Sequence, residues 1–123
     1  MQRPSDAVII RPQKNLAVIE FTLIPESWYF TGHFPDLPLL PGVVVLGWAL
    51  EWAQELFVLP PGCNLKIPRL KFLKPLKPGD AVRLTLTWQA SLHRLDFVYE
   101  CLTSAGVVAC AQGSARLNPV WRP

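Results

Sequence analysis

This sequence has no apolar run long enough to cross a bilayer. A membrane-spanning helix needs about 18 consecutive apolar residues, and none of the runs in the 123-residue chain reaches that length. The first six residues, MQRPSD, also lack the apolar core of a signal peptide. We therefore expect a cytoplasmic protein that has no membrane partner.

Cysteine is scarce and is not arranged for metal binding. The three cysteines, Cys63, Cys101 and Cys110, form an odd set with neither CxxC spacing nor a histidine nearby. This pattern argues against a disulfide framework and against a zinc site. It predicts three reduced, partly buried thiols and no metal.

Charged residues are also few, at 17% of the chain, and the net charge of +3 is not gathered into dense basic tracts. We therefore expect no nucleic-acid partner. Half of the residues are apolar, with five Trp and six Phe. Because a domain this small has much surface for its volume, that surplus predicts an apolar patch covered by another subunit. We expect an oligomer.

The order of apolar segments and turn signals predicts an α+β domain. A helix is expected over 42–58, after Pro41 and before Pro60, and its nearly continuous apolar surface leaves only a stripe at Gly47, Glu51 and Gln54. An antiparallel sheet should curl around this helix, with no internal repeat and no second domain. The expected strands are 7–10, 15–24, 65–73, 80–90, 92–104 and 107–117.

One histidine stands in a loop directly before the helix. Segment 31–41 holds three prolines and one glycine, which excludes a regular helix or strand there. His33 lies within it and can titrate near neutral pH. The first backbone N–H groups of the helix, at Gly42 and Val43, have no partner inside the helix and can polarise a carbonyl group. Acid–base chemistry on a carbonyl compound is the activity that this pattern favours.

Two motifs resemble a known family. GHFPDLPLLPG, at 32–42, closely resembles the GHFP-x-x-P-x-x-PG motif of bacterial 3-hydroxyacyl-(acyl carrier protein) dehydratases of the hotdog superfamily. LKFLKPLKPGD, at 70–80, resembles the family's KF-x-x-P-x-x-PGD strand and turn. The resemblance implies a hotdog fold, an antiparallel β-sheet wrapped around one long central α-helix, as a single domain over 1–123. A shorter likeness, PGVV followed by WAL, is to dehydratase-like subunits of aryl polyene and other specialised-lipid pathways.

The resemblance also implies a mechanism. In that family the histidine removes a proton from the carbon next to the thioester carbonyl, so His33 takes the role of base. The glycine amide at the helix start holds that carbonyl, which gives Gly42 a binding role. An acid on the partner subunit's helix protonates the departing hydroxyl group. The implied substrate is a 3-hydroxyacyl thioester on an acyl carrier protein, the product is a 2-enoyl thioester, and no cofactor is needed. A homodimer or a higher oligomer of dimers is implied.

The chain departs from the family at the acid. The acidic residue is expected fourteen positions after the histidine, where this sequence has Gly47. Glu51 lies one helical turn later on the same face, and the missing side chain at Gly47 leaves room for its carboxyl group to reach the site. Glu51 is therefore the candidate acid. Phe34, Trp48 and Trp52 are candidates to line an acyl tunnel, although core packing explains them equally well.

Several alternatives stay open. Glu51 and Gln54 can instead form the solvated edge of the helix. A hotdog thioesterase would use Glu51 to activate water, and a non-catalytic subunit that binds the acyl carrier protein would need no acid at Gly47. His93 is expected at the surface of a strand. Cations over 66–77 can face an acidic carrier protein or simply protect a strand edge.

Overall fold

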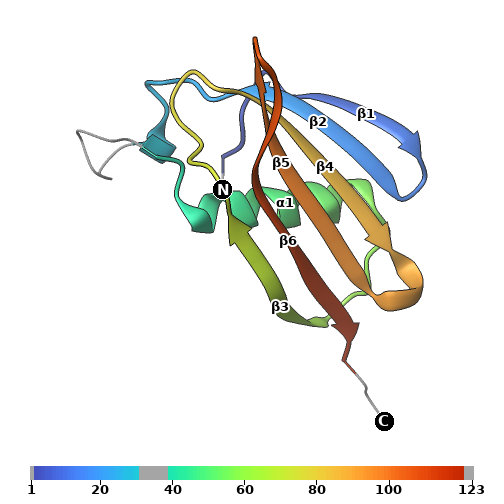
Figure 1. The fold of residues 1–123 in the computed structure, drawn as a ribbon. Helices are drawn as coiled ribbons and strands as arrows, with labels where there is room; N and C mark the ends of the chain where they lie inside the picture. The colour runs from blue at the N-terminus through green and yellow to red at the C-terminus, as the bar shows by residue number, and fades with distance from the viewer. Residues whose placement is uncertain (1, 31–38, 121–123) are drawn as a thin grey trace.

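Residues 2–30 and 39–120 are described by a computed structural model, which shows one antiparallel sheet and one long helix (Figure 1). The six strands lie in the order β1-β2-β4-β5-β6-β3, so β1 and β3 form the two edges. All neighbouring strands are antiparallel. The elements are β1 (Val8–Gln13), β2 (Leu16–Thr22), η1 (Trp28–Phe30), α1 (Gly42–Leu56), β3 (Cys63–Phe72), β4 (Ala81–Gln89), η2 (Ala90–Leu92), β5 (Arg94–Thr103) and β6 (Gly106–Pro119).

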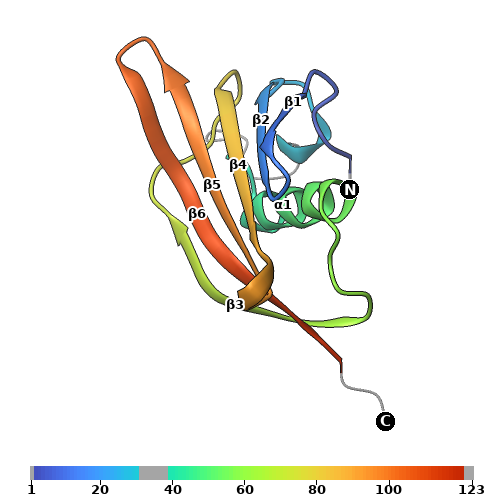
Figure 2. The same ribbon diagram turned by 90° about the vertical axis from the view of Figure 1, so that its right-hand side faces the viewer.

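Only one face of the sheet is covered by the helix. In β2, β4 and β5, buried side chains alternate with partly exposed ones along the strand, as the period of two requires for a sheet with one buried face. Figure 2 shows α1 on one side of the sheet, with β1 and β2 curling over it. Over the described residues the opposite face carries no helix. The predicted sheet wrapped around one helix is confirmed.

The helix begins where the sequence indicates and ends slightly earlier. Pro41 is the N-cap residue, with an extended backbone (φ −63°, ψ 144°), and helical geometry starts at Gly42. The last helical residue is Leu56, two positions before the predicted end, and Phe57 donates its N–H to the carbonyl of Ala53 at 2.9 Å. The described helices are too short and not apolar enough to cross a membrane.

Aromatic side chains form the centre of the core. Trp48 and Trp52 are almost fully buried, and both pack against Phe21, with ring centroids 5.7 and 5.5 Å away. Tyr29 meets the Trp48 ring edge-on at 5.1 Å. The Trp48 indole donates a hydrogen bond to the carbonyl of Gln2 at 3.1 Å, so its polar atom is satisfied. Of the two interpretations left open for these tryptophans, the contacts favour core packing.

Most strand boundaries lie within two residues of the prediction, and three departures from it are informative. β1 runs through Pro12 instead of ending before it, because an edge strand can do without one backbone N–H group. β6 continues to Pro119, two residues past the predicted end, with Asn118 paired to Asn64. His93 lies in a left-handed turn before β5 and not in a strand, as its φ of 47° shows.

The prediction of three reduced thiols is wrong for two of them. The structure joins Cys101 of β5 and Cys110 of β6 in a disulfide, with the Cα atoms 6.4 Å apart, whereas Cys63 is free and half-buried. Cys110 falls at an irregularity in the β5–β6 pairing. This bulge turns its side chain toward the buried face that Cys101 also occupies. The sequence has no signal for this bulge.

Candidate active site

Unpaired amides mark the start of α1. The carbonyl of Pro41 accepts hydrogen bonds from the amides of Val44 and Val45, at 3.0 and 3.1 Å. The amides of Gly42 and Val43 come before these, and neither has a hydrogen-bond partner among residues 2–30 and 39–120. These amides carry the partial positive charge of the helix N-terminus. They can therefore stabilise negative charge on a ligand oxygen.

An apolar pocket of about 280 Å³ opens beside these amides. It is formed by the loop before α1, the first helical turn and the segment after β3. The amide of Leu40 donates to the carbonyl of Leu76 at 2.8 Å. The amides of Leu73 and Lys74 both donate to the carbonyl of Cys110, at 2.8 and 3.1 Å. The walls are therefore fixed by backbone bonds. The lining consists of Leu39, Leu40, Gly42, Val45, Phe72, Leu73, Lys74, Pro75 and Leu76.

The absence of a side chain at position 42 allows a close contact. A Cβ atom there would lie 2.9 Å from the Cζ atom of Phe72, which is closer than carbon atoms normally approach. The ring of Phe72 is half-exposed and lies over the helix start. The contact therefore holds an aromatic wall against the backbone that carries the unpaired amides.

The other predicted site residues are only partly placed by the structure. His33 and Phe34 lie outside the described residues. Val43 is 69% exposed and does not line the pocket, although its amide lies beside that of Gly42. Gly47 is half-buried on the following turn. Of the described site residues, only Gly42 lies in the pocket itself.

Glu51 does not reach this pocket within its own chain. Glu51 follows Gly42 by nine positions, which corresponds to about 13 Å along the helix axis. Its carboxylate lies near Arg3 and helps to raise the pKa of that guanidinium group, although the larger cause is the hydrogen bond from Arg3 to Glu55. Arg3 also lies over the ring of Trp52, at 5.4 Å from its centroid. Any role for Glu51 at a helix start must therefore involve another subunit.

The segment after β3 forms a wall of the site that our sequence reasoning did not assign. Phe72, Leu73, Lys74 and Leu76 line the pocket, and they belong to the second motif, at 70–80. That motif was used to identify the family. Its apolar residues between prolines were a usable signal for a rigid wall. A second hollow, of about 460 Å³, lies beside Leu50 and Gln54 near the other end of α1.

No group of three or more His, Cys, Asp or Glu side chains that could hold a metal ion occurs within residues 2–30 and 39–120. The described pocket instead offers backbone donors and apolar walls. Such a site can bind an acyl group and polarise its carbonyl oxygen.

Known proteins match this chain over most of its length. The model of the ApeI-like family, described as ApeI dehydratase, matches residues 9–114. The 3-hydroxyacyl-[acyl-carrier-protein] dehydratase FabZ of Cupriavidus metallidurans is 32% identical over 110 residues, which cover 80% of this chain and 71% of that protein. A similar relative is FabZ of Koribacter versatilis, 30% identical over 113 residues, which cover 81% of this chain and 71% of that protein.

Solved structures agree with this assignment. The dehydratase heterocomplex ApeI:P from Xenorhabdus doucetiae contains a chain that superposes with a TM-score of 0.83 and is 33% identical, covering 95% of this chain and 99% of that one. The predicted hotdog fold is therefore confirmed. Together with the family match over residues 9–114, this likeness shows that the chain belongs to the ApeI-like dehydratases.

Proposed function

We propose that this chain removes water from 3-hydroxyacyl thioesters carried on an acyl carrier protein, as an enzyme of fatty-acid or specialised-lipid biosynthesis. The observation that carries the proposal is the apolar pocket at the start of α1, into which Gly42 brings an amide with no partner among the described residues. It occurs in a chain that belongs to a dehydratase family. The proposal places the reaction in the cytoplasm and on a single domain.

The reaction divides among three groups. The amide of Gly42 donates a hydrogen bond to the thioester carbonyl and stabilises the negative charge that develops on its oxygen. His33 removes a proton from C2, and the electrons of that C–H bond form the C2=C3 double bond as the C3–O bond breaks. Glu51 protonates the departing hydroxyl group, so that water leaves. The product is a 2-enoyl thioester.

We further propose that the active form is a homodimer in which Glu51 of one chain serves the pocket of the other. β3 is an edge strand, so its outer backbone groups are available for pairing. Exposed apolar side chains lie on and beside it, including Leu65, Phe72 and Leu73. Joining two copies along β3 would cover these side chains and place two pockets within reach of two helices.

A second candidate function follows from Gly47. A chain without the usual acid can be a subunit that binds the acyl carrier protein but depends on a different hotdog chain for turnover. The structural relative from Xenorhabdus doucetiae is itself a heterocomplex. Co-purification with a second hotdog chain, together with no turnover by the isolated protein, would favour this candidate.

The decisive experiment uses the purified protein with a 3-hydroxyacyl thioester of an acyl carrier protein, and mass spectrometry follows the loss of one water. His33→Ala and Glu51→Gln should each abolish the reaction, while Gln54→Glu serves as a control on the same stripe of α1. Release of free carrier thiol would indicate a thioesterase instead. No water loss from the unaltered protein would refute the dehydratase proposal.

Mixing the two inactive variants tests whether the site is shared between subunits. If His33 and Glu51 act across a dimer, random exchange makes half of the dimers hybrid, and each hybrid has one intact site. Activity should then return to roughly a quarter of the unaltered level. A mixture that exchanges subunits but stays inactive would refute a site shared in this way.

A further inference from the structure

The open face of the sheet is strongly cationic over β3, β5 and β6. Directly paired residues of antiparallel strands point to the same face, and the pairing aligns three rows. Lys66 and Arg94 are both paired with Arg116, Arg69 and Asp96 with Ser114, and Lys71 and Val98 with Gln112. The intervening residues of β5 are buried on the helix side. All three rows therefore lie on the face that α1 does not cover.

These three rows hold the protein's positive charge excess. The five cations of these rows face a single anion within them, Asp96, which gives the rows a net charge of +4. Glu100, further along β5, and the ion pair of Arg83 with Glu20 lie on the same face outside the rows. The chain as a whole has twelve cations, nine anions and a net charge of +3, so the remaining seven cations and eight anions sum to −1. The excess positive charge is thus concentrated in these three rows and not spread evenly over the surface.

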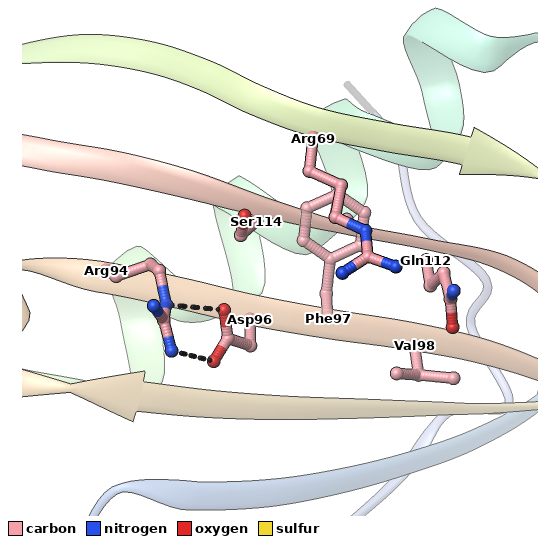
Figure 3. Close-up of a pocket in the computed structure, with 8 residues that line it drawn as sticks. Arg69, Arg94, Asp96, Phe97, Val98, Gln112 and Ser114 are labelled. Carbon is pink, nitrogen blue, oxygen red and sulfur yellow. Dashed lines mark hydrogen bonds and ion pairs between the residues drawn. The ribbon is translucent and has the colours of Figure 1, made fainter.

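A hollow of about 330 Å³ lies in the middle of this cationic face (Figure 3). The pairing of β3 with β6 shifts register between Lys66 and Arg69. Gly113 lets the β3 backbone come close, since a Cβ atom there would lie 2.6 Å from the carbonyl oxygen of Arg69. The rim is formed by Arg69, Arg94, Asp96, Val98, Gln112 and Ser114.

The two arginines at this hollow differ in their partners. Arg94 forms a two-pronged ion pair with Asp96, at 2.9 and 3.2 Å (Figure 3). Arg69 is exposed, and its guanidinium group has no hydrogen-bond or ion-pair partner in the described part of the chain. In Figure 3 the Arg69 side chain reaches over the hollow, on the side where Gln112 lies. An uncompensated arginine with polar neighbours is suited to bind a carboxylate.

This cationic face is close to the candidate active site. Arg69 and Phe72 are three residues apart on β3, which is about 10 Å along a strand. Phe72 and Lys74 line the pocket at the start of α1. A partner that is bound at Arg69 on the open face can therefore reach the pocket by passing around the end of β3. Protection of a strand edge does not explain the pattern, since Arg94 and Arg116 are on interior strands.

We infer that this face, centred on Arg69, is the docking surface for the acidic side chains of the acyl carrier protein. The inference rests on the proposed function, because it takes the acyl group to arrive on a carrier. Carboxylates of the carrier would pair with Arg69 and with the neighbouring Lys66, Lys71 and Arg116. The bound carrier would present its acyl arm to the pocket beside Gly42.

The test reverses one charge and compares two substrates. Arg69→Glu is measured on a 3-hydroxyacyl carrier thioester and on the same acyl group as an N-acetylcysteamine thioester, which has no protein carrier. The matched control is Lys14→Glu, an equal charge change at the β1–β2 turn on the opposite edge of the sheet. Arg69→Glu should lower kcat/KM for the carrier substrate about tenfold or more at low salt, mainly through KM. It should leave the small thioester unaffected.

Several outcomes would overturn the docking surface. Arg69→Glu could lower activity equally on both substrates, or fail to lower it on the carrier substrate. Lys14→Glu could lower activity as much as Arg69→Glu does. The unaltered protein could also bind duplex DNA as tightly as it binds the carrier. Failure of the proposed function gives a different result, namely no dehydration of either substrate by the unaltered protein. In that case calorimetry of carrier binding still decides, because Arg69→Glu should weaken binding and Lys14→Glu should not. Absence of carrier binding would refute the inference.

Discussion

Replacing Gly42 with proline should remove one catalytic hydrogen-bond donor without disturbing the fold. Proline has no backbone N–H group, and it is favoured at the first position of a helix, which is the position of Gly42. The residue before a proline must have an extended backbone, and Pro41 already has one, with ψ at 144°. We therefore expect Gly42→Pro to fold with an intact α1.

The matched control is Gly42→Ala, which keeps the N–H group. Both variants add a Cβ atom about where it meets the Phe72 ring, 2.9 Å from Cζ. Because the ring is half-exposed, it can move in both variants. The ratio of the dehydration rates of Gly42→Pro and Gly42→Ala therefore measures the contribution of the N–H donor alone. Loss of one such donor typically lowers kcat about 100- to 1000-fold, so Gly42→Pro should be slower than Gly42→Ala by about that factor.

The assay follows formation of the 2-enoyl thioester by its absorbance, with circular dichroism and thermal unfolding to verify that both variants are folded. Gly42→Ala should retain measurable dehydration and Gly42→Pro very little. If the two folded variants turn over at the same rate, the Gly42 amide is not the carbonyl donor, and the mechanism proposed above is refuted at that step.

Three further predictions concern stability. Tyr99→Phe removes the buried hydrogen bond to the carbonyl of Val45, 2.7 Å long, and should lower the free energy of unfolding by about 1 kcal/mol. Burial raises the pKa of Tyr99 well above 10.0. The unfolded chain therefore ionises first, and the unaltered protein should lose stability as the pH rises above 10. Tyr99→Phe should lack that part of the loss in denaturant titrations. Gly113→Ala should cost about 1–3 kcal/mol, because the added Cβ atom meets β3 backbone, whereas Ser114→Ala should change melting little. The hydrogen bond from Arg3 lowers the pKa of Glu55 below 4.5. The stability from this pair should therefore be present above pH 4.5 and be lost as the pH falls through the lower value. A difference in melting temperature between Glu55→Gln and the unaltered protein that persists in acid would contradict this.

Local signals were sufficient to predict the elements of the fold. Proline suits a helix start, and the apolar run after Pro41 determined α1 to within two residues at its end. The strands were predicted from β-branched and aromatic residues between turn signals. The first strand was wrongly predicted to end before Pro12, because the sequence does not show which strands lie at the edge of the sheet. Proline is tolerated in β1 only because β1 is an edge.

Contacts between distant segments were beyond sequence reasoning. The approach of Phe72 to Gly42, the pairing of Cys101 with Cys110 and the placement of Arg3 over Trp52 each depend on how strands and termini meet in space. The two motifs identified the family, and Gly42 could be assigned from the first. The apolar residues between prolines in the second motif could indicate a rigid wall. That this wall faces Gly42 depends on the register of β3, which no local pattern reveals.

Strand β3 connects the features on which the proposals depend. On the helix side Phe72 forms a wall of the pocket, and on the open face Arg69 and Lys71 belong to the cationic surface. The free edge of β3 is the expected line of contact with a second subunit. A slip of one residue would exchange the two faces of a strand, so the register must be fixed firmly. The close approach of Arg69 to Gly113 and the bonds from Leu73 and Lys74 to the Cys110 carbonyl fix it at both ends of the segment. Pocket, carrier docking and dimer contact therefore depend on the same pairing of β3 with β6, and a change that loosens that pairing should impair all three together.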